Sequence, residues 1–242
     1  MRIAVVGTTG SGKTTLARAL AAQLALSYIE MDALNWQTGW RDVSRTDPEE
    51  FVRRVAVAVA DEAWVVDGNY GLVRDLVWRR ATHLVWLDYD RSIIMWRVIR
   101  RSLVRAALRT QLWAGNRERW SHMLRPSHPI RWAWDTWDRR RKDFEERVGR
   151  QDYAHLAVLR LRRPREAETL LSELKQMRGP SALTELWETP KCRAPGGRVA
   201  QRESTPFTRV GSQVQSLSRP PLRKTKYDRR VAQWQSAPIT WA

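Results

Sequence analysis

The sequence comprises 242 residues, and 43% of them are hydrophobic, which is enough to form the core of one domain of ordinary size. A single cysteine, Cys192, excludes an intramolecular disulfide and a cysteine-based metal site, and it fits a reducing, cytoplasmic location. No stretch reaches the roughly 18 apolar residues that a membrane span needs, so we expect no membrane partner. The net charge of +17 indicates a partner that carries phosphate, either a nucleotide or a nucleic acid, unless the basic surface is simply solvated.

Short apolar runs alternate with helix-patterned segments along residues 1–178. Buried strands are predicted at residues 3–6, 28–32, 64–68, 83–88 and 156–161. Helices are predicted at residues 14–26, 48–63, 72–80, 92–108, 133–148 and 164–177. Asp47, followed by Pro48, is typical of the start of the second helix. This alternation predicts an α/β fold with a doubly wound parallel sheet.

A glycine-rich motif of the form G-x-x-x-x-G-K-T follows the first predicted strand directly. It comprises Gly7, Thr8, Thr9, Gly10, Ser11, Gly12, Lys13 and Thr14, with Thr15 next in the chain. Glycines let successive backbone N–H groups converge on phosphate, and the helix that follows adds its own N-terminal donors. Lys13 is expected to reach the β- and γ-phosphates, and the Thr14 hydroxyl is expected to ligate Mg²⁺. The motif therefore predicts a nucleotide-binding P-loop, with the choice between ATP and GTP open.

Three aspartates lie at the ends of predicted strands, where ligands of such sheets bind. Asp67 is a candidate to hold a Mg²⁺-bound water, and a turn-capping role before Gly68 is the alternative. Asp32 is a candidate to orient or deprotonate an acceptor hydroxyl, with a turn residue as the alternative. Asp88 is a weaker candidate because Asp90 and Arg91 follow it in an apparent turn.

Residues 97–150 form a basic region with 15 Lys and Arg against 6 Asp and Glu. Arg97 and Arg101 lie one helical turn apart, and Arg139 begins a run of three arginines. We expect these three residues to act in catalysis from an arginine-rich flap that neutralises charge on a transferring phosphoryl group. A solvated basic helix is the alternative.

Fourteen tryptophans are an unusual feature of the composition. Trp36 and Trp40 follow Asp32 and are candidates to wall a substrate pocket. Tryptophans of the basic region are candidates to stack on a base, although packing in a core is the more common role of this residue.

Residues 179–242 differ in character from the rest, with many Pro, Ser, Gly, Arg and Gln residues and no apolar periodicity. This composition predicts a disordered basic tail. Residues 211–221 and 231–237 are compatible with translated transfer-RNA gene sequence. One hypothesis is therefore that the tail is read-through sequence, and the alternative is a genuine tail that contacts nucleic acid.

The motifs together resemble adenylate-kinase-like P-loop proteins, closest to the group labelled topology modulation protein, or FlaR-like. The resemblance covers about residues 1–178. It is carried by residues 7–15, by Met31 to Trp36 with Gly39-Trp40, by Trp64 to Tyr70, by Leu87-Asp88 with Arg97 and Arg101, and by Leu159 to Leu161 with Pro164. It implies a five-stranded parallel sheet, ATP with Mg²⁺ as cofactors, a short acceptor-binding segment at 33–62 and a basic lid at 97–150.

The resemblance also implies roles for individual residues. Asp67 matches the Asp of the nucleoside monophosphate kinase Asp-Gly-Phe-Pro-Arg motif, and Arg97 and Arg101 match the paired arginines that enter the lid. Here Gly68-Asn69-Tyr70-Gly71 replaces Gly-Phe-Pro-Arg, so the arginine that grips the acceptor monophosphate is missing there. Arg74, Arg41 and Arg53 are candidate substitutes.

The sequence thus favours an ATP-dependent phosphotransferase that acts on a nucleoside monophosphate or a small hydroxyl acceptor. The alternative is a nucleotide-dependent DNA- or RNA-binding protein, in which the charge gives nonspecific attraction to nucleic acid. A zinc site is not expected, because the four histidines are widely spaced.

Overall fold

The computed structural model describes residues 1–108, 110–116 and 129–177. The predicted tail at 179–242 lies outside the described residues, as does the part of the predicted lid at 117–128.

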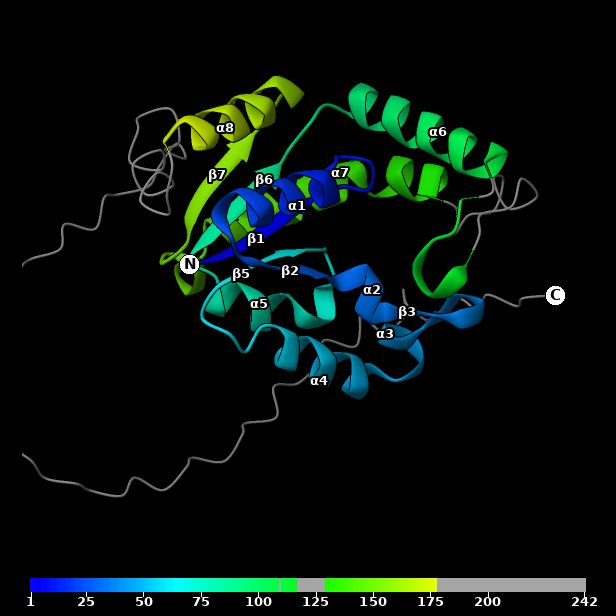
Figure 1. The fold of residues 1–242 in the computed structure, drawn as a ribbon, viewed down its shortest axis with the longest axis horizontal. Coiled ribbons are helices and arrows are strands. Elements are labelled where there is room, and N and C mark those ends of the chain that lie inside the picture. Colours follow the sequence, from blue (N-terminus) through cyan, green and yellow to red (C-terminus); the bar gives the residue numbers. More distant parts are fainter. Residues whose placement is uncertain (109, 117–128, 178–242) are drawn as a thin grey trace, which may run out of the picture. The chain divides into compact units, whose positions relative to one another are not determined.

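Five parallel strands form the central sheet, as the alternating sequence pattern predicts (Figure 1). The strands are β1 (Arg2–Gly7), β2 (Ser27–Glu30), β5 (Trp64–Asp67), β6 (His83–Leu87) and β7 (Ala157–Leu161). Their order in the sheet is β2-β5-β1-β6-β7, so the strand before the P-loop lies in the centre. Each neighbouring pair is parallel, which requires the crossover helices that the sequence supplies between the strands.

Helices cover both faces of the sheet, and each face has its own core (Figure 1). The longer helices are α1 (Lys13–Leu24), α4 (Pro48–Ala58), α5 (Arg74–Arg80), α6 (Arg91–Ala107), α7 (Pro129–Val148) and α8 (Pro164–Met177). Along β1, Ile3 and Val5 pack with residues of α1, α6 and α8, whereas Ala4 and Val6 pack with residues of α4, α5 and α7. This alternation explains why the strand is apolar throughout, since both of its faces are buried.

The chain between β2 and α4 is built from short elements rather than loop. These are α2 (Met31–Asn35), β3 (Trp36–Gln37), the 3-10 helix η1 (Thr38–Trp40), β4 (Arg41–Asp42) and α3 (Val43–Thr46). Asn35 is fully buried, and its Oδ1 accepts from the backbone N–H of Ser44 at 2.7 Å. At the start of α4, the Asp47 carboxylate accepts from the N–H of Glu50 at 3.1 Å, which confirms the predicted N-cap.

One boundary differs from the prediction and moves a candidate residue. The second strand ends at Glu30, and Asp32 lies in the first turn of α2 instead of at the end of the strand. Strand propensity along Tyr28 and Ile29 does not extend past Glu30, because the helical turn begins at Met31; the hydrogen bond from Ser44 to Asn35 then holds the end of this turn. Asp32 still follows the carboxyl end of β2 directly.

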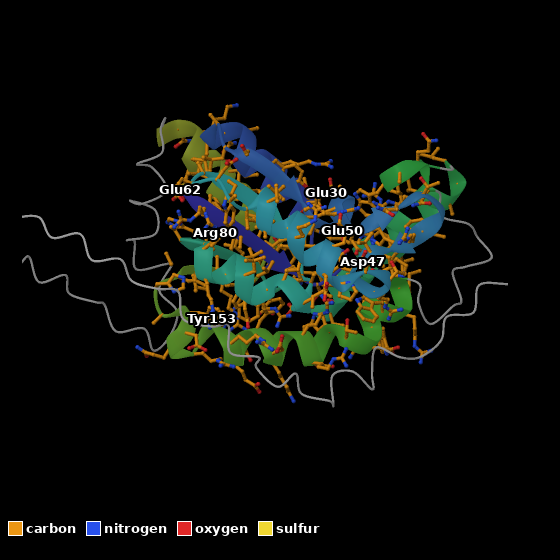
Figure 2. All side chains as sticks on the ribbon, turned by 90° about the horizontal axis from the view of Figure 1, so that it is seen from below. Glu30, Asp47, Glu50, Glu62, Arg80 and Tyr153 are labelled. Atoms are coloured by element: carbon orange, nitrogen blue, oxygen red, sulfur yellow. The ribbon has the colours of Figure 1, made fainter. Side chains whose placement is uncertain are left out.

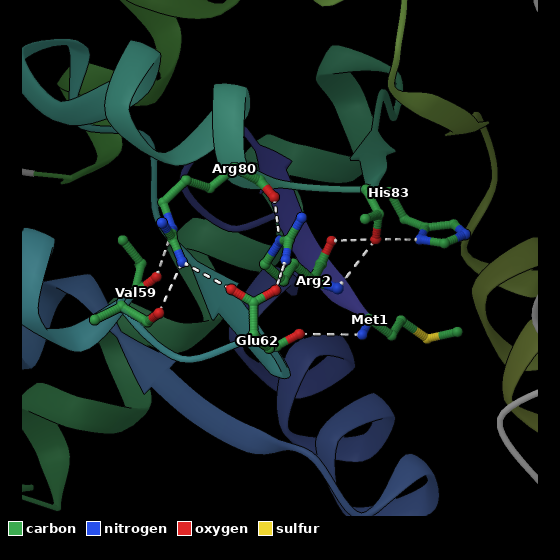
Figure 3. Close-up of polar contacts among 8 residues, drawn as sticks. Met1, Arg2, Val59, Glu62, Arg80 and His83 are labelled. Atoms are coloured by element: carbon green, nitrogen blue, oxygen red, sulfur yellow. Dashed lines mark hydrogen bonds and ion pairs between the residues drawn. The ribbon is translucent and has the colours of Figure 1, made fainter. Parts of the chain in front are cut away.

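A polar network joins the amino ends of the strands (Figure 3). Arg2 and Arg80 both pair with the carboxylate of Glu62, and the N-terminal ammonium donates to the Glu62 carbonyl oxygen at 3.2 Å. Glu62 and Arg80 lie toward one end of the domain, and Glu30 and Glu50 toward the other (Figure 2). Glu62 is 81% exposed, so these ion pairs contribute little stability individually.

Among the described helices, none combines the length and the apolar character that crossing a membrane requires.

Candidate nucleotide-binding and phosphotransfer site

The register of the sheet brings three strand ends together at one edge. Val5 pairs with Asp67, and Asp67 pairs with Glu30 of β2. The P-loop therefore begins at Gly7, two residues beyond the level of Asp67. The crevice outside the carboxyl ends of parallel strands is where such folds bind ligands.

The backbone of the P-loop depends on glycine at two positions. Gly10 has φ +84° and Gly12 has φ +91°, which lie in the left-handed region that side chains disfavour. A Cβ added at Gly10 would come within 2.2 Å of the Val98 side chain. Gly12 is the N-cap of α1, and the N–H groups of the first turn have no partner within the helix. The loop and the helix start together present donors of the kind that bind phosphate.

The hydroxyl-bearing residues of the motif lie in different environments. Thr8 and Ser11 are buried, whereas Thr15 is exposed in the first turn of α1. The Ser11 Oγ has no hydrogen-bond partner among the described residues. An orphaned buried hydroxyl inside a loop rich in N–H donors fits a loop that closes around an anion.

Both carboxylates and guanidinium groups act on the charge of Lys13. Burial lowers the pKa of its ammonium group, the carboxylates of Asp32 and Asp67 raise it, and the guanidinium groups of Arg101 and Arg140 lower it. Burial is the largest of these effects, so the net pKa is below the usual lysine value and the buried ammonium group is favoured by additional negative charge nearby. A polyphosphate chain would supply that charge.

Thr14 and Asp67 are brought together as the sequence predicts for a Mg²⁺ site. The Thr14 hydroxyl donates to Oδ2 of Asp67 at 2.5 Å, and the Tyr28 hydroxyl donates to Oδ1 at 3.2 Å. Burial raises the pKa of Asp67, and the Thr14 hydrogen bond opposes this. The hydroxyl and the carboxylate are hard oxygen ligands, which suit Mg²⁺ together with water and phosphate oxygens. The residues therefore fit Mg²⁺ bound to a nucleoside triphosphate.

Asp32 is held by a residue to which we assigned no role in the sequence. The Tyr70 hydroxyl donates to Oδ1 of Asp32 at 2.6 Å, and burial followed by the Asp32 charge raises the pKa of Tyr70 well above the usual tyrosine value. Tyr70 therefore stays protonated and fixes one carboxylate oxygen. Asp32 directly follows the carboxyl end of β2, and its charge raises the pKa of Lys13 in the P-loop.

The three arginines predicted for catalysis lie in different positions. Nη1 of Arg97 donates to the carbonyl oxygen of Ser11 at 3.0 Å, which supports the P-loop from α6. Arg101, one turn later, is half-buried and close enough for its charge to lower the pKa of Lys13. Arg139 is exposed on α7 beside a surface hollow, and its neighbour Arg140 is the residue of α7 whose charge reaches Lys13.

The contacts of Asp88 give this carboxylate a structural role. Arg160 donates to its Oδ2 from Nε at 2.8 Å and from Nη2 at 2.5 Å, and Nε of Arg141 lies 3.3 Å from Oδ1. Two guanidinium groups thus occupy this buried carboxylate, and they join β7 and α7 to the end of β6.

The segment after α6 folds back onto the predicted acceptor segment (Figure 1). The Asn116 side chain accepts from the N–H of Trp40 at 3.0 Å and donates to the carbonyl oxygen of Gln37 at 2.8 Å. Nε1 of Trp113 donates to Glu30 at 2.8 Å. Trp36 packs edge-on against Trp40 with ring centroids 5.6 Å apart. These contacts enclose the site on the side of α2.

Sequence reasoning assigned no contact to Tyr28 or Tyr70, and it named Arg140 only as one of a run of three arginines. A tyrosine in a strand is usually a packing residue, and nothing in spacing shows which hydroxyl meets a carboxylate across the sheet. Within the run of three arginines, the sequence does not show that Arg139 is exposed whereas Arg140 is half-buried.

Comparisons with known proteins found one family model that matches part of the chain and several similar solved structures. The model of the AAA family, ATPases associated with various cellular activities, matches residues 3–63, which is well under half of the chain. Comparison with curated proteins gave no match.

Several solved structures are similar in fold. A shikimate kinase from Acinetobacter baumannii in complex with shikimate is 18% identical, with 73% of this chain and 91% of that chain covered and a TM-score of 0.45. A gluconokinase from Sinorhizobium meliloti 1021 is 18% identical, with coverage of 77% and 93% and a TM-score of 0.43. Identities this low transfer no activity, and it is the strand order, the P-loop sequence and the loop geometry of this chain that establish a P-loop α/β fold.

Proposed function

We propose that this protein is an ATP-dependent kinase that transfers the γ-phosphoryl group of Mg²⁺-ATP to a hydroxyl or phosphate oxygen of a small acceptor. The observation that carries the proposal is the convergence of Lys13, the Thr14–Asp67 pair and the Tyr70-bound Asp32 at the carboxyl edge of the sheet. Lys13 and the Thr14–Asp67 pair have the chemistry of a nucleotide and metal site. Asp32 adds a carboxylate that can accept the proton of an acceptor hydroxyl.

The residues of the site have separate tasks in this reaction. The P-loop N–H groups and Lys13 bind and orient the phosphates, and Arg97 keeps the loop in place through Ser11. Thr14 and Asp67 would hold Mg²⁺, and Arg101 would neutralise charge on the transferring group. Asp32, with one oxygen fixed by Tyr70, accepts the proton of the acceptor hydroxyl through its other oxygen. Bound Mg²⁺ lowers the charge repulsion between the phosphates and the incoming nucleophile.

We further propose that residues 33–62 bind the acceptor and that residues 97–150 act as the lid, with Arg139 on its surface. Trp36 and Trp40 lie in the first segment, and Asn116 connects it to the second. The motifs around Leu34 to Trp36 and Asp67 to Tyr70 support the further proposal that the protein belongs to the topology modulation, or FlaR-like, group. Its location is proposed to be cytoplasmic.

A coupled assay for ADP release tests the proposal. The protein is incubated with Mg²⁺-ATP and a panel of nucleoside monophosphates and small hydroxy acids. We expect at least one acceptor to stimulate turnover, and we expect Asp32→Asn to lower that kcat by about 100-fold or more while nucleotide affinity is retained. Absence of acceptor-stimulated turnover with any member of the panel counts against a kinase.

A second candidate function is nucleotide-dependent binding of nucleic acid. One observation favours it, because the Arg91 guanidinium lies 3.7 Å from the ring centroid of Trp134, which is 52% exposed. An exposed indole beside a cation can stack on an unpaired base. Fluorescence anisotropy with single-stranded DNA at two salt concentrations separates the cases. Affinity that depends on bound ATP supports this function, whereas affinity that disappears with salt and ignores ATP marks nonspecific attraction.

A further inference from the structure

An arginine cluster lies on the acceptor side of the site. It indicates the chemistry of the acceptor, an inference that rests on the proposed function. The cluster is formed by Arg74 of α5 and by Arg139, Arg140 and Arg147 of α7. It lies beside Tyr70, whose hydroxyl holds Asp32.

A single carboxylate, Asp143, is shared by two members of the cluster. Nη1 of Arg74 donates to Oδ2 of Asp143 at 2.8 Å, and Nε of Arg147 donates to Oδ1 at 2.7 Å. The Arg74 guanidinium also lies over the rings of Trp78 and Phe144, at 5.8 and 5.5 Å from their centroids. Arg74 is therefore fixed in place, and both oxygens of Asp143 are engaged.

Arg140 forms no ion pair with a described residue, although the charge of Asp143 acts on it from nearby. It is half-buried, and it makes no ion pair or hydrogen bond with any described residue, its one ring contact being with Trp132 at 5.5 Å. Burial, then the charges of Arg74 and Arg139, lower its pKa to about 10, so it still carries its charge at neutral pH. A guanidinium that is desolvated and repelled by its neighbours is stabilised when an anion binds.

Arg74 is excluded as the direct contact by the space around it. The buried Nε of Arg74 has no hydrogen-bond partner among the described residues. Arg74 lines a cavity of about 10 Å³ together with Asn69 and Tyr70. That volume holds about one water molecule and no phosphate group. We therefore expect an anion to approach the cluster on the side of Arg140, whose charge also lowers the pKa of Lys13 in the P-loop.

We propose that the acceptor carries an anionic group, a phosphate monoester or a carboxylate, and that Arg140 binds this group while Asp32 receives the proton of the reacting hydroxyl. Arg74 acts as a positioning residue, because it holds Asp143 and so prevents this carboxylate from pairing with Arg140. The anion-binding arginine thus comes from α7 rather than from the turn after β5, where Asn69 and Tyr70 stand.

Calorimetric titration of small anions tests the proposal independently of turnover. The full chain is first saturated with Mg²⁺ and a non-hydrolysable ATP analogue, so that the P-loop is filled, and then titrated with inorganic phosphate or with acetate. We expect one of the two anions to bind, and the anion that binds shows whether the acceptor group is a phosphate or a carboxylate. Arg140→Gln is expected to weaken that binding by about 10- to 100-fold, the loss typical of a charge-assisted contact.

Arg131→Gln is the matched control, since it removes the same charge from the same helix at an exposed position where Arg131 pairs, among the described residues, only with Asp135. We expect it to change anion affinity less than two-fold. If Arg140→Gln does not fold, Arg140→Lys keeps the charge without the planar fork, and a loss of about three- to ten-fold is expected.

The outcomes separate the two proposals. Failure of the ATP analogue to bind refutes the proposed function at the first step. Normal binding of the analogue, with no anion binding or with equal anion affinity in wild type and the Arg140 variant, overturns the anion subsite alone. Equal losses in the Arg131 and Arg140 variants also overturn it, because they show general charge attraction.

Discussion

Replacement of Gly10 by alanine tests whether the P-loop backbone is as constrained as the structure indicates. The φ of +84° costs alanine about 1–2 kcal/mol relative to glycine. The new Cβ would lie 2.2 Å from Cγ2 of Val98, where about 3.5–4 Å is comfortable, and overpacking of this kind costs about 1–3 kcal/mol. We therefore expect Gly10→Ala to lower the free energy of unfolding by about 2–5 kcal/mol.

A double-mutant cycle divides this loss into its two causes. Val98→Ala alone leaves a cavity in the core between α6 and the sheet and is expected to cost about 1.5–3 kcal/mol. In the double variant, the alanine at position 10 has room, so the overpacking contribution disappears and only the backbone strain remains. The double variant should accordingly be more stable, by about 1–3 kcal/mol, than the sum of the single changes predicts.

Urea denaturation followed by far-UV circular dichroism measures the four unfolding free energies, and calorimetry with an ATP analogue measures the affinity of the same four proteins. We expect affinity to fall in Gly10→Ala and to recover in part in the double variant, because the loop returns toward its native path. Additivity of the two changes within about 0.5 kcal/mol would refute the claim that Val98 sets the position of the loop.

Three further predictions concern single residues of the site. Lys13→Ala should weaken binding of an ATP analogue by about 30-fold or more, and unchanged affinity by calorimetry would remove the basis of the nucleotide assignment. Burial raises the folded-state pKa of Asp67, so ionisation of this carboxylate lowers the stability of the fold as pH rises through that pKa. Asp67→Asn should therefore raise the Tm of the protein without nucleotide at pH 7, and it should weaken Mg²⁺-ATP binding about 10-fold or more. A lower Tm for the variant would contradict this reasoning. Tyr70→Phe should lower kcat about 10-fold with little change in nucleotide affinity, and a change in affinity alone would place Tyr70 outside the acceptor side.

The fold is the part that sequence reasoning predicted well, and the backbone of the predicted phosphate-binding loop has the positive φ angles that its glycines allow. Both follow from local patterns: an apolar run that is buried on both faces, a glycine motif directly after it and an amphipathic helix after that. The pairing of Thr14 with Asp67 was also predictable, because parallel strands end at a common edge and the order of the strands follows from the crossovers.

The acceptor side was predicted less completely, for physical reasons. Its key contacts join residues far apart in the chain, such as Tyr70 with Asp32 and Arg74 with Asp143. Side-chain orientation decides them, and a change of one residue in helical phase exchanges Arg139 for Arg140. The α2 turn that carries Asp32 is fixed by Asn35 and Ser44, which a strand pattern does not reveal.

The charges of the site indicate how stability and function oppose each other in this protein. Burial shifts Lys13, Asp67 and Arg140 toward their neutral forms, so each is unfavourable as a charge in the nucleotide-free protein. The ligands that we propose carry the complementary charges: a polyphosphate for Lys13, a divalent cation for Asp67 and the acceptor anion for Arg140. Binding of each ligand should therefore stabilise the fold as well as complete the site. The ion pairs around Glu62 are exposed, so their charges stay solvated, and they lie at the opposite end of the sheet.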